Sequence, residues 1–172
     1  MSSPSGRRAF GTIVAAVAIV AAVGAVLAWP RLFLVIAERG HPVQVFWTAP
    51  GERFTLSWIH SVEKEAWEET FRIDGEGAIS VVATRFKTFG AGVPSDVGTI
   101  TRLEDGWVVM EGIERRVDPL AVQAASAESY RLRWRGREIA LSTPGTAPIL
   151  TFEPVVASFA GIAPAWFDAV AR

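Results

Sequence analysis

The sequence predicts an all-β fold, an antiparallel β-sandwich or partly open barrel of about 8–10 strands, preceded by one N-terminal transmembrane helix. Two observations support this expectation. Short runs of β-branched and aromatic residues recur along residues 31–172, and most of them end at Gly or Pro, as strands that end in turns do. Before them, residues 9–29 form a single uncharged apolar run.

The apolar run has the length of a membrane-spanning helix. Its 21 residues would extend roughly 30 Å as a helix, which matches the hydrocarbon core of a bilayer. Arg7 and Arg8 precede the run, and such a pair stays in the cytoplasm, so the rest of the chain is expected on the other side. The expected parts are a cytoplasmic N-terminus (1–8), a transmembrane signal anchor (9–30) and an extracytoplasmic β-domain (31–172), in the periplasm or outside the cell.

Two other interpretations of the N-terminus remain open. Val26, Leu27 and Ala28 offer a cleavage site for a signal peptide, although the apolar part of such a peptide usually has only about 7–15 residues. Residues 6–10 resemble a twin-arginine export signal, but the long apolar run weakens that interpretation.

The first strands follow the apolar run in order. Residues 31–40 and 41–51 each read as a strand ended by a turn. Residues 52–62 alternate strictly, with one face made of Phe54, Leu56, Trp58, His60 and Val62. Residues 66–77 place Trp67, Glu69, Phe71 and Ile73 on one face and end in the turn sequence DGEG, so residues 78–89 are expected to return as the next strand.

The second half of the chain continues the pattern. Further strands are expected at 107–112, 114–120, 129–142 with a hairpin turn at Arg135 and Gly136, and 148–155. Residues 90–106 are expected to be the least regular stretch. Helices are considered at 120–129, which can equally be strand and loop, and at 164–172, where Pro164 would occupy the first turn.

Composition excludes several classes of site. The chain has no cysteine, which removes disulfides, thiolate metal sites and thiol nucleophiles. Residues 31–172 carry 15 basic and 18 acidic residues without a basic stripe, so nucleic-acid binding is not expected.

The first candidate site is a cluster in residues 58–73, WIHSVEKEAWEETFRI. Its members are His60, Ser61, Glu63, Trp67 and Glu69. A hairpin with its tip near residues 62–66 would bring Trp67 or Glu69 opposite His60 and give the imidazole a carboxylate partner. The simpler interpretation is a half-buried histidine satisfied by a neighbour, beside a charged hairpin tip that discourages aggregation.

Two sharper chemistries fit this cluster poorly. Ser61 directly follows His60, and neighbours in a strand point to opposite faces, so the two cannot share a proton in a nucleophilic triad. His60 with Glu63, Glu65 and Glu69 offers nitrogen and oxygen ligands, yet no H-x-H or H-E-x-x-H spacing is present, and His41 is expected to be solvated near the membrane. We therefore expect no metal, no cofactor and no assigned catalytic residue.

The second candidate is a binding loop. It comprises Arg85, Lys87, Gly90, Ala91, Gly92 and Pro94. Glycines at 90 and 92 permit backbone N–H groups to form a concave site for a carboxylate or phosphate, and the two cations share one face of their strand. A turn ended by Pro94 would explain the glycines equally well.

Two segments of the chain carry a resemblance to a known family. W-I-H-S-V-E-K-E-x-W-x-E at Trp58–Glu69 and T-R-F-K-T-F-G-A-G-V-P-S at Thr84–Ser95 are similar to motifs of small exported bacterial proteins classed as a domain of unknown function. Their genes often lie beside tripartite ATP-independent periplasmic (TRAP) transporters of the TAXI type. The similarity covers roughly residues 40–150. It implies an association with solute uptake but assigns no role to the motif residues.

Three functions follow as expectations. The first is a non-enzymatic accessory of a TRAP/TAXI system, anchored in the cytoplasmic (inner) membrane and in contact with the membrane subunit or the solute receptor. The second is a module that binds a small anionic solute. The third is a hydrolase or isomerase in which His60 acts as base and Glu63 or Glu69 orients it.

Overall fold

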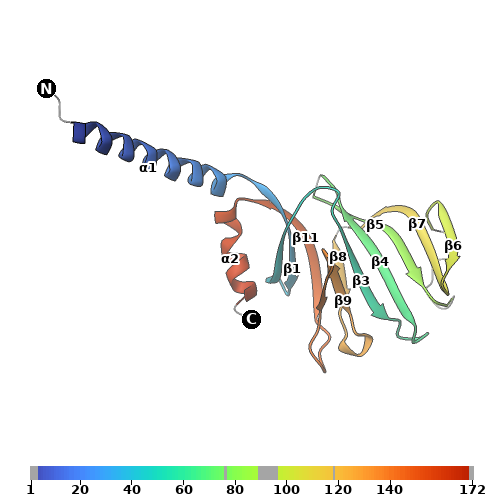
Figure 1. The fold of residues 1–172 in the computed structure, drawn as a ribbon. Coiled ribbons are helices and arrows are strands. Elements are labelled where there is room, and N and C mark those ends of the chain that lie inside the picture. The colour runs from blue at the N-terminus through green and yellow to red at the C-terminus, as the bar shows by residue number, and fades with distance from the viewer. Residues whose placement is uncertain (1–3, 76, 89–96, 118, 171–172) are drawn as a thin grey trace.

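A computed structural model of the chain describes residues 4–75, 77–88, 97–117 and 119–170, and the side chains of residues 4–9 are not described. It has a long N-terminal helix, a two-layer β-domain and a short C-terminal helix (Figure 1). The helices are α1 (Pro4–Ala28), the 3₁₀ turn η1 (Ser126–Glu128) and α2 (Phe159–Val170). The strands are β1 (Arg31–Glu38), β2 (His41–Thr48), β3 (Arg53–Ile59), β4 (Ala66–Ile73), β5 (Ile79–Phe86), β6 (Ile100–Glu104), β7 (Trp107–Arg116), β8 (Leu120–Gln123), β9 (Arg131–Trp134), β10 (Arg137–Ala140) and β11 (Ile149–Ala157).

The strands form two antiparallel sheets. One sheet has the order β2-β1-β11-β8, and the other has the order β10-β9-β3-β4-β5-β7-β6. Neither sheet closes on itself in the described part of the chain, so the fold is an open sandwich. The all-β prediction is confirmed, with 11 described strands instead of about 8–10.

The core lies between the inner faces of the two sheets. Strict alternation directs Phe54 of β3 and Phe71 of β4 inward, where their rings stack 5.1 Å apart between centroids. Phe54 also stacks on Phe152 of β11 at 5.8 Å, which joins the two layers. Each buried side chain of this size contributes roughly 1.5–3 kcal/mol to folding.

The four-stranded sheet is covered on both faces. Leu34 and Ile36 of β1 face the core, while Phe33 and Val35 of the same strand face α2. Five consecutive residues of β1 are therefore buried, which explains why its sequence is a continuous apolar run.

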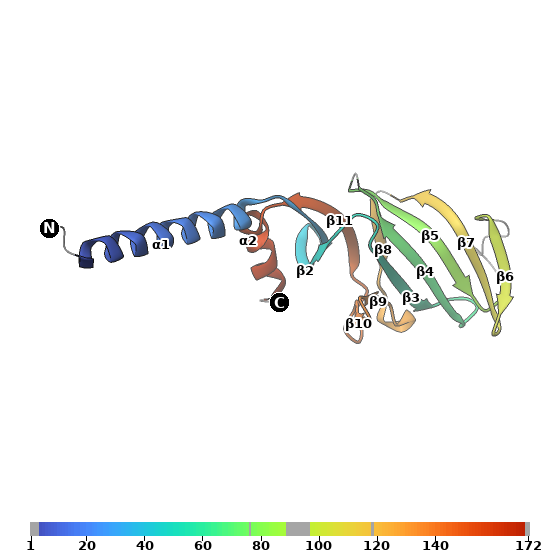
Figure 2. The ribbon, with the colours of Figure 1, turned by 45° about the horizontal axis from the view of Figure 1, so that its top comes forward.

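Helix α1 projects from the domain (Figure 2). Residues Phe10–Ala28, 19 residues with a mean hydropathy of 2.5, are long and apolar enough to cross a membrane, and none of them is buried in the protein. Only Trp29 and Pro30 separate α1 from β1.

Three sequence-based boundaries were wrong. Residues 107–116 form the single strand β7, because the backbone at Gly112 (φ 69°) and Glu114 (φ 48°) makes a bulge that lets the strand continue. Residues 100–104, expected to be irregular, form the edge strand β6. Helix α2 begins at Phe159, where the Ser158 hydroxyl accepts a hydrogen bond from the Gly161 N–H at 3.0 Å, so Pro164 lies inside the helix.

Candidate functional site

The β3–β4 hairpin carries the first candidate cluster. Trp58 pairs with Trp67 and Ile59 pairs with Ala66, which leaves residues 60–65 as the connection. The His60 N–H donates to the Glu65 carbonyl at 2.8 Å, and the Lys64 N–H donates to the His60 carbonyl at 2.9 Å. The chain therefore reverses where the sequence predicts it.

His60 is held by a ring and a backbone group. Its imidazole stacks on Trp67 with centroids 5.3 Å apart, and its Nδ1 accepts a hydrogen bond from the Glu63 N–H at 3.3 Å. The contact with Glu63 thus uses the backbone and not the carboxylate. Ser61 is exposed next to it.

A row of stacked rings supports the histidine. Tyr130 stacks on Trp58 at 5.3 Å, Trp58 on Trp67 at 5.6 Å, and Trp67 packs on Phe86 at 5.2 Å. The indole N–H of Trp67 donates to the Thr84 hydroxyl at 2.9 Å. This row crosses β3, β4 and β5 and fixes one end of the seven-stranded sheet.

Of the two residues predicted to lie opposite His60, Trp67 is the one that does. The carboxylate of Glu69 does not pair with the imidazole, which corrects that part of the prediction. The strand register places Glu69 opposite Leu56 on one side and Thr84 on the other, whereas Trp67 stacks on the imidazole. Glu69 instead faces inward between Leu56 and Thr84, where no described residue hydrogen-bonds its carboxyl. Burial raises the pKa of this carboxyl, and the charge of Arg115 offsets the rise only in part.

Glu68, the preceding residue, lies on the opposite face of β4. It forms ion pairs with Arg85 at 2.8 Å and with Arg133 at 3.4 Å. Burial alone would raise the pKa of Glu68, but hydrogen bonds from Arg85 and then Arg133 outweigh it and lower that pKa. Two adjacent glutamates thus have opposite electrostatic environments.

The two cations of the second candidate share a face, as the alternation predicts. The Arg85 guanidinium lies 4.6 Å and the Lys87 ammonium 5.4 Å from the ring centroid of Trp107. Beside them a groove of about 370 Å³ runs over the outer face of the sheet. Its charged lining residues are Arg85, Arg102, Glu68, Glu104, Asp105 and Glu111. Carboxylates outnumber cations there, which does not favour an anion.

Gly90, Ala91, Gly92 and Pro94 lie outside the described residues. The described residues that flank them show where their segment starts and ends. Thr88 lines a shallow depression together with His60, Glu63, Trp67 and Lys87, and this depression has no room for a water molecule. Val97 packs on the cluster that contains Trp67 and Phe86. The described parts of the two motif segments, residues 58–69 and 84–88, therefore lie together at one end of the seven-stranded sheet.

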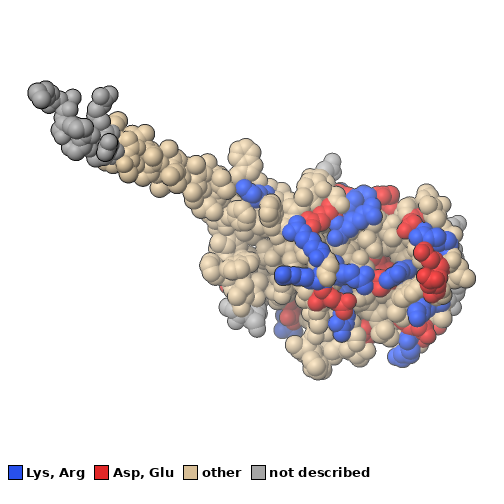
Figure 3. All heavy atoms as spheres, viewed as in Figure 1, with Lys and Arg blue, Asp and Glu red and all other residues tan. Residues whose placement is uncertain are grey.

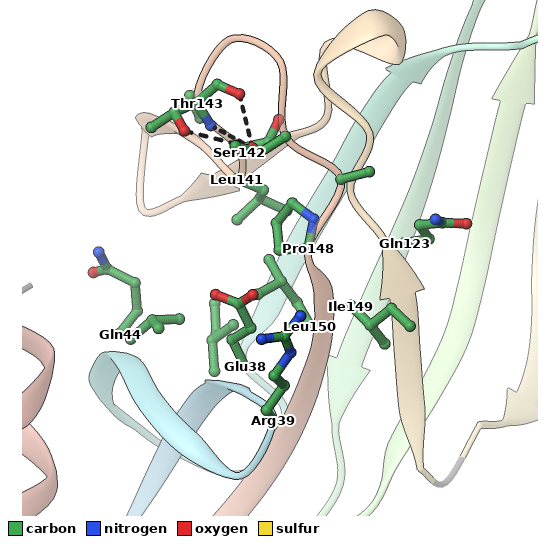
Figure 4. A pocket seen from close by; sticks show the side chains of 15 residues that line it. Glu38, Arg39, Gln44, Gln123, Leu141, Ser142, Thr143, Pro148, Ile149 and Leu150 are labelled. Carbon is green, nitrogen blue, oxygen red and sulfur yellow. Dashed lines mark hydrogen bonds between the residues drawn. The ribbon is translucent and has the colours of Figure 1, made fainter.

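A larger groove lies elsewhere and contains none of the predicted residues. It has a volume of about 760 Å³ between the β1–β2 turn and the segment before β11. Figure 4 shows side chains lining it, among them Glu38, Arg39, Gln44, Gln123 and Leu150. The turn at Arg39 and Gly40 and the Pro- and Gly-rich residues 144–148 are the sequence signals that flank it.

The described residues do not form a metal site. In residues 4–75, 77–88, 97–117 and 119–170, no three His, Asp or Glu side chains lie close enough together to hold an ion. His41, at the start of β2, is exposed.

Comparison with known proteins places the site within a family. Residues 54–141, just over half of the chain, match the family described as "Domain of unknown function (DUF1850)". The match includes the whole seven-stranded sheet except the first residue of β3, whereas β1, β2 and β11 lie outside it. No curated protein and no solved structure matches the chain. The chain, with both motif segments inside the matched residues, belongs to this family of unknown function.

Proposed function

We propose that the chain is a membrane-anchored accessory protein without catalytic activity. In this proposal its sandwich stands on the extracytoplasmic side of the inner membrane and docks on a TRAP transporter of the TAXI type, at the membrane subunit or the solute receptor. The proposal rests on the convergence of the two motif segments at the end of the seven-stranded sheet.

The form of that end suits a protein partner. The depression at His60 is too shallow to enclose a solute, and its charged rim includes Glu63, Glu65 and Lys87. Stacked rings of Trp58 and Trp67 hold the surface rigid from below. A rigid surface loses little conformational entropy when a partner binds.

Co-purification tests the docking. The tagged chain, produced at native level and solubilised gently, should bring down the membrane subunit or the receptor. The rim variants His60→Ala and Lys87→Glu should reduce recovery about tenfold, since each removes a contact worth about 1.4 kcal/mol.

Two controls make the same histidine substitution and the same reversal of charge elsewhere. His41→Ala and Arg137→Glu alter exposed residues away from the depression and should leave recovery unchanged. If the unaltered chain never recovers a transporter component, and its deletion leaves uptake of the receptor's solute intact, the proposal fails.

The two alternatives have less support. A solute with negative charge would meet four carboxylates beside Arg85 and Arg102. An enzyme using His60 as base would need an orienting carboxylate, and the described partner of its Nδ1 is a backbone N–H. A rise in melting temperature with millimolar organic acids would restore the solute alternative.

A further inference from the structure

Helix α2 has two apolar faces, and the described part of the chain covers only one of them. Ile162 is buried against Phe33 and Val35 of β1, with Phe159 packed beside it. The residues that point away include Phe167 and Val170, which are 63% and 66% exposed. Asp168 is the only charged residue of the helix. A helix that is apolar all round is normally buried on all sides.

The exposed face of α2 is continued by other aromatic residues. Trp29, Trp47 and Trp166 are all exposed, and Trp47 lies 6.4 Å from Phe159 between ring centroids. Helix α2 also contacts α1 directly. In the face shown in Figure 3, the charged side chains gather over the part of the domain away from α1, and the surface next to α1 is almost free of them.

We infer that this surface, defined as Trp29, Trp47, Trp166, Phe167 and Val170, lies in the headgroup layer of the membrane that α1 crosses. The occupant of the exposed face of α2 is thus the lipid bilayer itself. Helix α2 is an interfacial helix, with one face on the sheet and the other among the lipids.

The chain connection sets the depth. The link of Trp29 and Pro30 spans at most about 10 Å, and the interfacial layer on each side of a bilayer is roughly 5–8 Å thick. The start of β1 and its neighbours on α2 therefore cannot lie far outside that layer. Figures 1 and 2 both show α2 crosswise to α1, so a helix α1 that crosses the membrane puts α2 along its surface.

Arg31 fits the same position. Its guanidinium lies 4.9 Å from the ring centroid of Phe159 and 5.6 Å from that of Trp47. Its Nε is buried and has no hydrogen-bond partner among the described residues. A cation held between aromatic rings at the end of a membrane helix meets lipid phosphates, and Trp is common at that depth.

Single cysteines test the inference in the full-length chain, which has none of its own. Phe167→Cys, Val170→Cys and the control Leu103→Cys on β6, 77% exposed, are labelled with bimane. The labelled chains are reconstituted in vesicles of phosphatidylcholine and phosphatidylglycerol. Brominated phosphatidylcholine should reduce emission about twofold or more at 167 and 170, because an interfacial helix buries its apolar face about 5–10 Å deep. Emission at 103 should not change.

A second variant distinguishes loss of lipid contact by α2 from misfolding of the protein. Phe167→Asp, added to Val170→Cys, should abolish quenching by lipid while circular dichroism stays unchanged, since residue 167 is outside the core. Equal quenching by lipid and equal access to iodide at positions 103, 167 and 170 would overturn the inference. Protection from iodide without lipid quenching, lost on dilution of the protein in lipid, would show that a second copy covers α2 and would also overturn it. No transporter is present, so failure here leaves the proposed docking untouched.

Discussion

Glu68 and Glu69 show how one step along a strand reverses the role of a side chain. Glu68 points to the outer face and meets Arg85 and Arg133, whereas Glu69 points inward opposite Leu56. Both carboxyls are shielded from water, but only Glu68 receives hydrogen bonds from described cations. The pKa of Glu68 is lowered and that of Glu69 is raised.

We predict opposite effects for the two amide variants. Glu69 binds its proton more tightly in the folded state, so its contribution to stability is fully present below the ordinary pKa of 4.5 and is lost as pH rises through the raised pKa. Glu69→Gln should therefore stabilise the protein near pH 7 by roughly 1 kcal/mol and have little effect at about pH 4.

Glu68→Gln is the matched comparison. The lowered pKa of Glu68 means that its stabilisation is present above 4.5 and is lost as pH falls through the lowered value. Because both arginines are well exposed, the variant should cost only about 0.5–1 kcal/mol near pH 7. Urea unfolding at several pH values measures both, and the same sign for both variants near neutral pH would contradict the assignment.

Gly98 and Gly112 allow the segment that precedes β6 to lie in close contact with β7. Both have positive φ, 83° and 69°, and a Cβ on either would overlap an atom of the other strand, the Glu111 carbonyl or the Thr99 hydroxyl. Gly106 also has positive φ, 76°, but faces open space.

We predict that Gly112→Ala destabilises the protein more than Gly106→Ala does. The control should cost about 1 kcal/mol, from the strained backbone alone, whereas Gly112→Ala adds the displacement of Thr99 and should cost about 2–4 kcal/mol. Thermal unfolding compares the stability of the two variants. An equal loss of stability would show that Thr99 moves aside at little cost.

At the scale of elements, the β3–β4 hairpin depends on one residue in a left-handed conformation. Lys64 has φ 57°, and its N–H closes the turn on the His60 carbonyl. Lys64→Gly should stabilise the hairpin by about 0.5–1 kcal/mol, and Lys64→Val should destabilise it, because a β-branched residue fits that backbone poorly. Chemical denaturation measures the change in unfolding free energy for both variants. If the two changes do not have opposite signs, the turn adapts to the residue at position 64 and the prediction is wrong.

The edge strand β6 explains why one element was missed. All five of its residues are exposed, so neither face of the strand has to be apolar. Its sequence accordingly lacks the alternation of apolar and polar residues that predicts a strand. It becomes a strand because β7 offers it a free edge, and Gly98 and Gly112 allow the close approach. That contact depends on the fold and not on local sequence.

At the scale of the whole molecule, α1 and the β-domain are nearly independent. Residues 10–28 are not buried in the protein, and their contact with the domain is made through α2. Removal of residues 1–28 should therefore leave the unfolding free energy unchanged within about 1 kcal/mol, since little apolar surface is lost. Circular dichroism of the shortened chain tests this, and loss of cooperative unfolding would show that α1 is part of the fold.

The sequence by itself predicted an antiparallel sandwich or partly open barrel and its separation from the N-terminal apolar helix. Strict alternation in residues 52–62 and 66–73 fixed which side chains face the core, because neighbours in a strand point to opposite faces. The hairpin turn at Arg135 and Gly136 was equally local, with φ values of 47° and 75°. Such features depend on a few adjacent residues, and each can be found without the rest of the fold.

Only the tertiary structure decided what each candidate residue touches. The alternation placed His60 and Glu69 on one side of the sheet, but the register put Trp67 beside the histidine and placed Glu69 between Leu56 and Thr84. The exposed face of α2 could likewise not be found in a helix sequence that is apolar apart from Asp168. Register and covering layers arise from contacts between distant segments, and a side chain's partner and its pKa depend on those contacts.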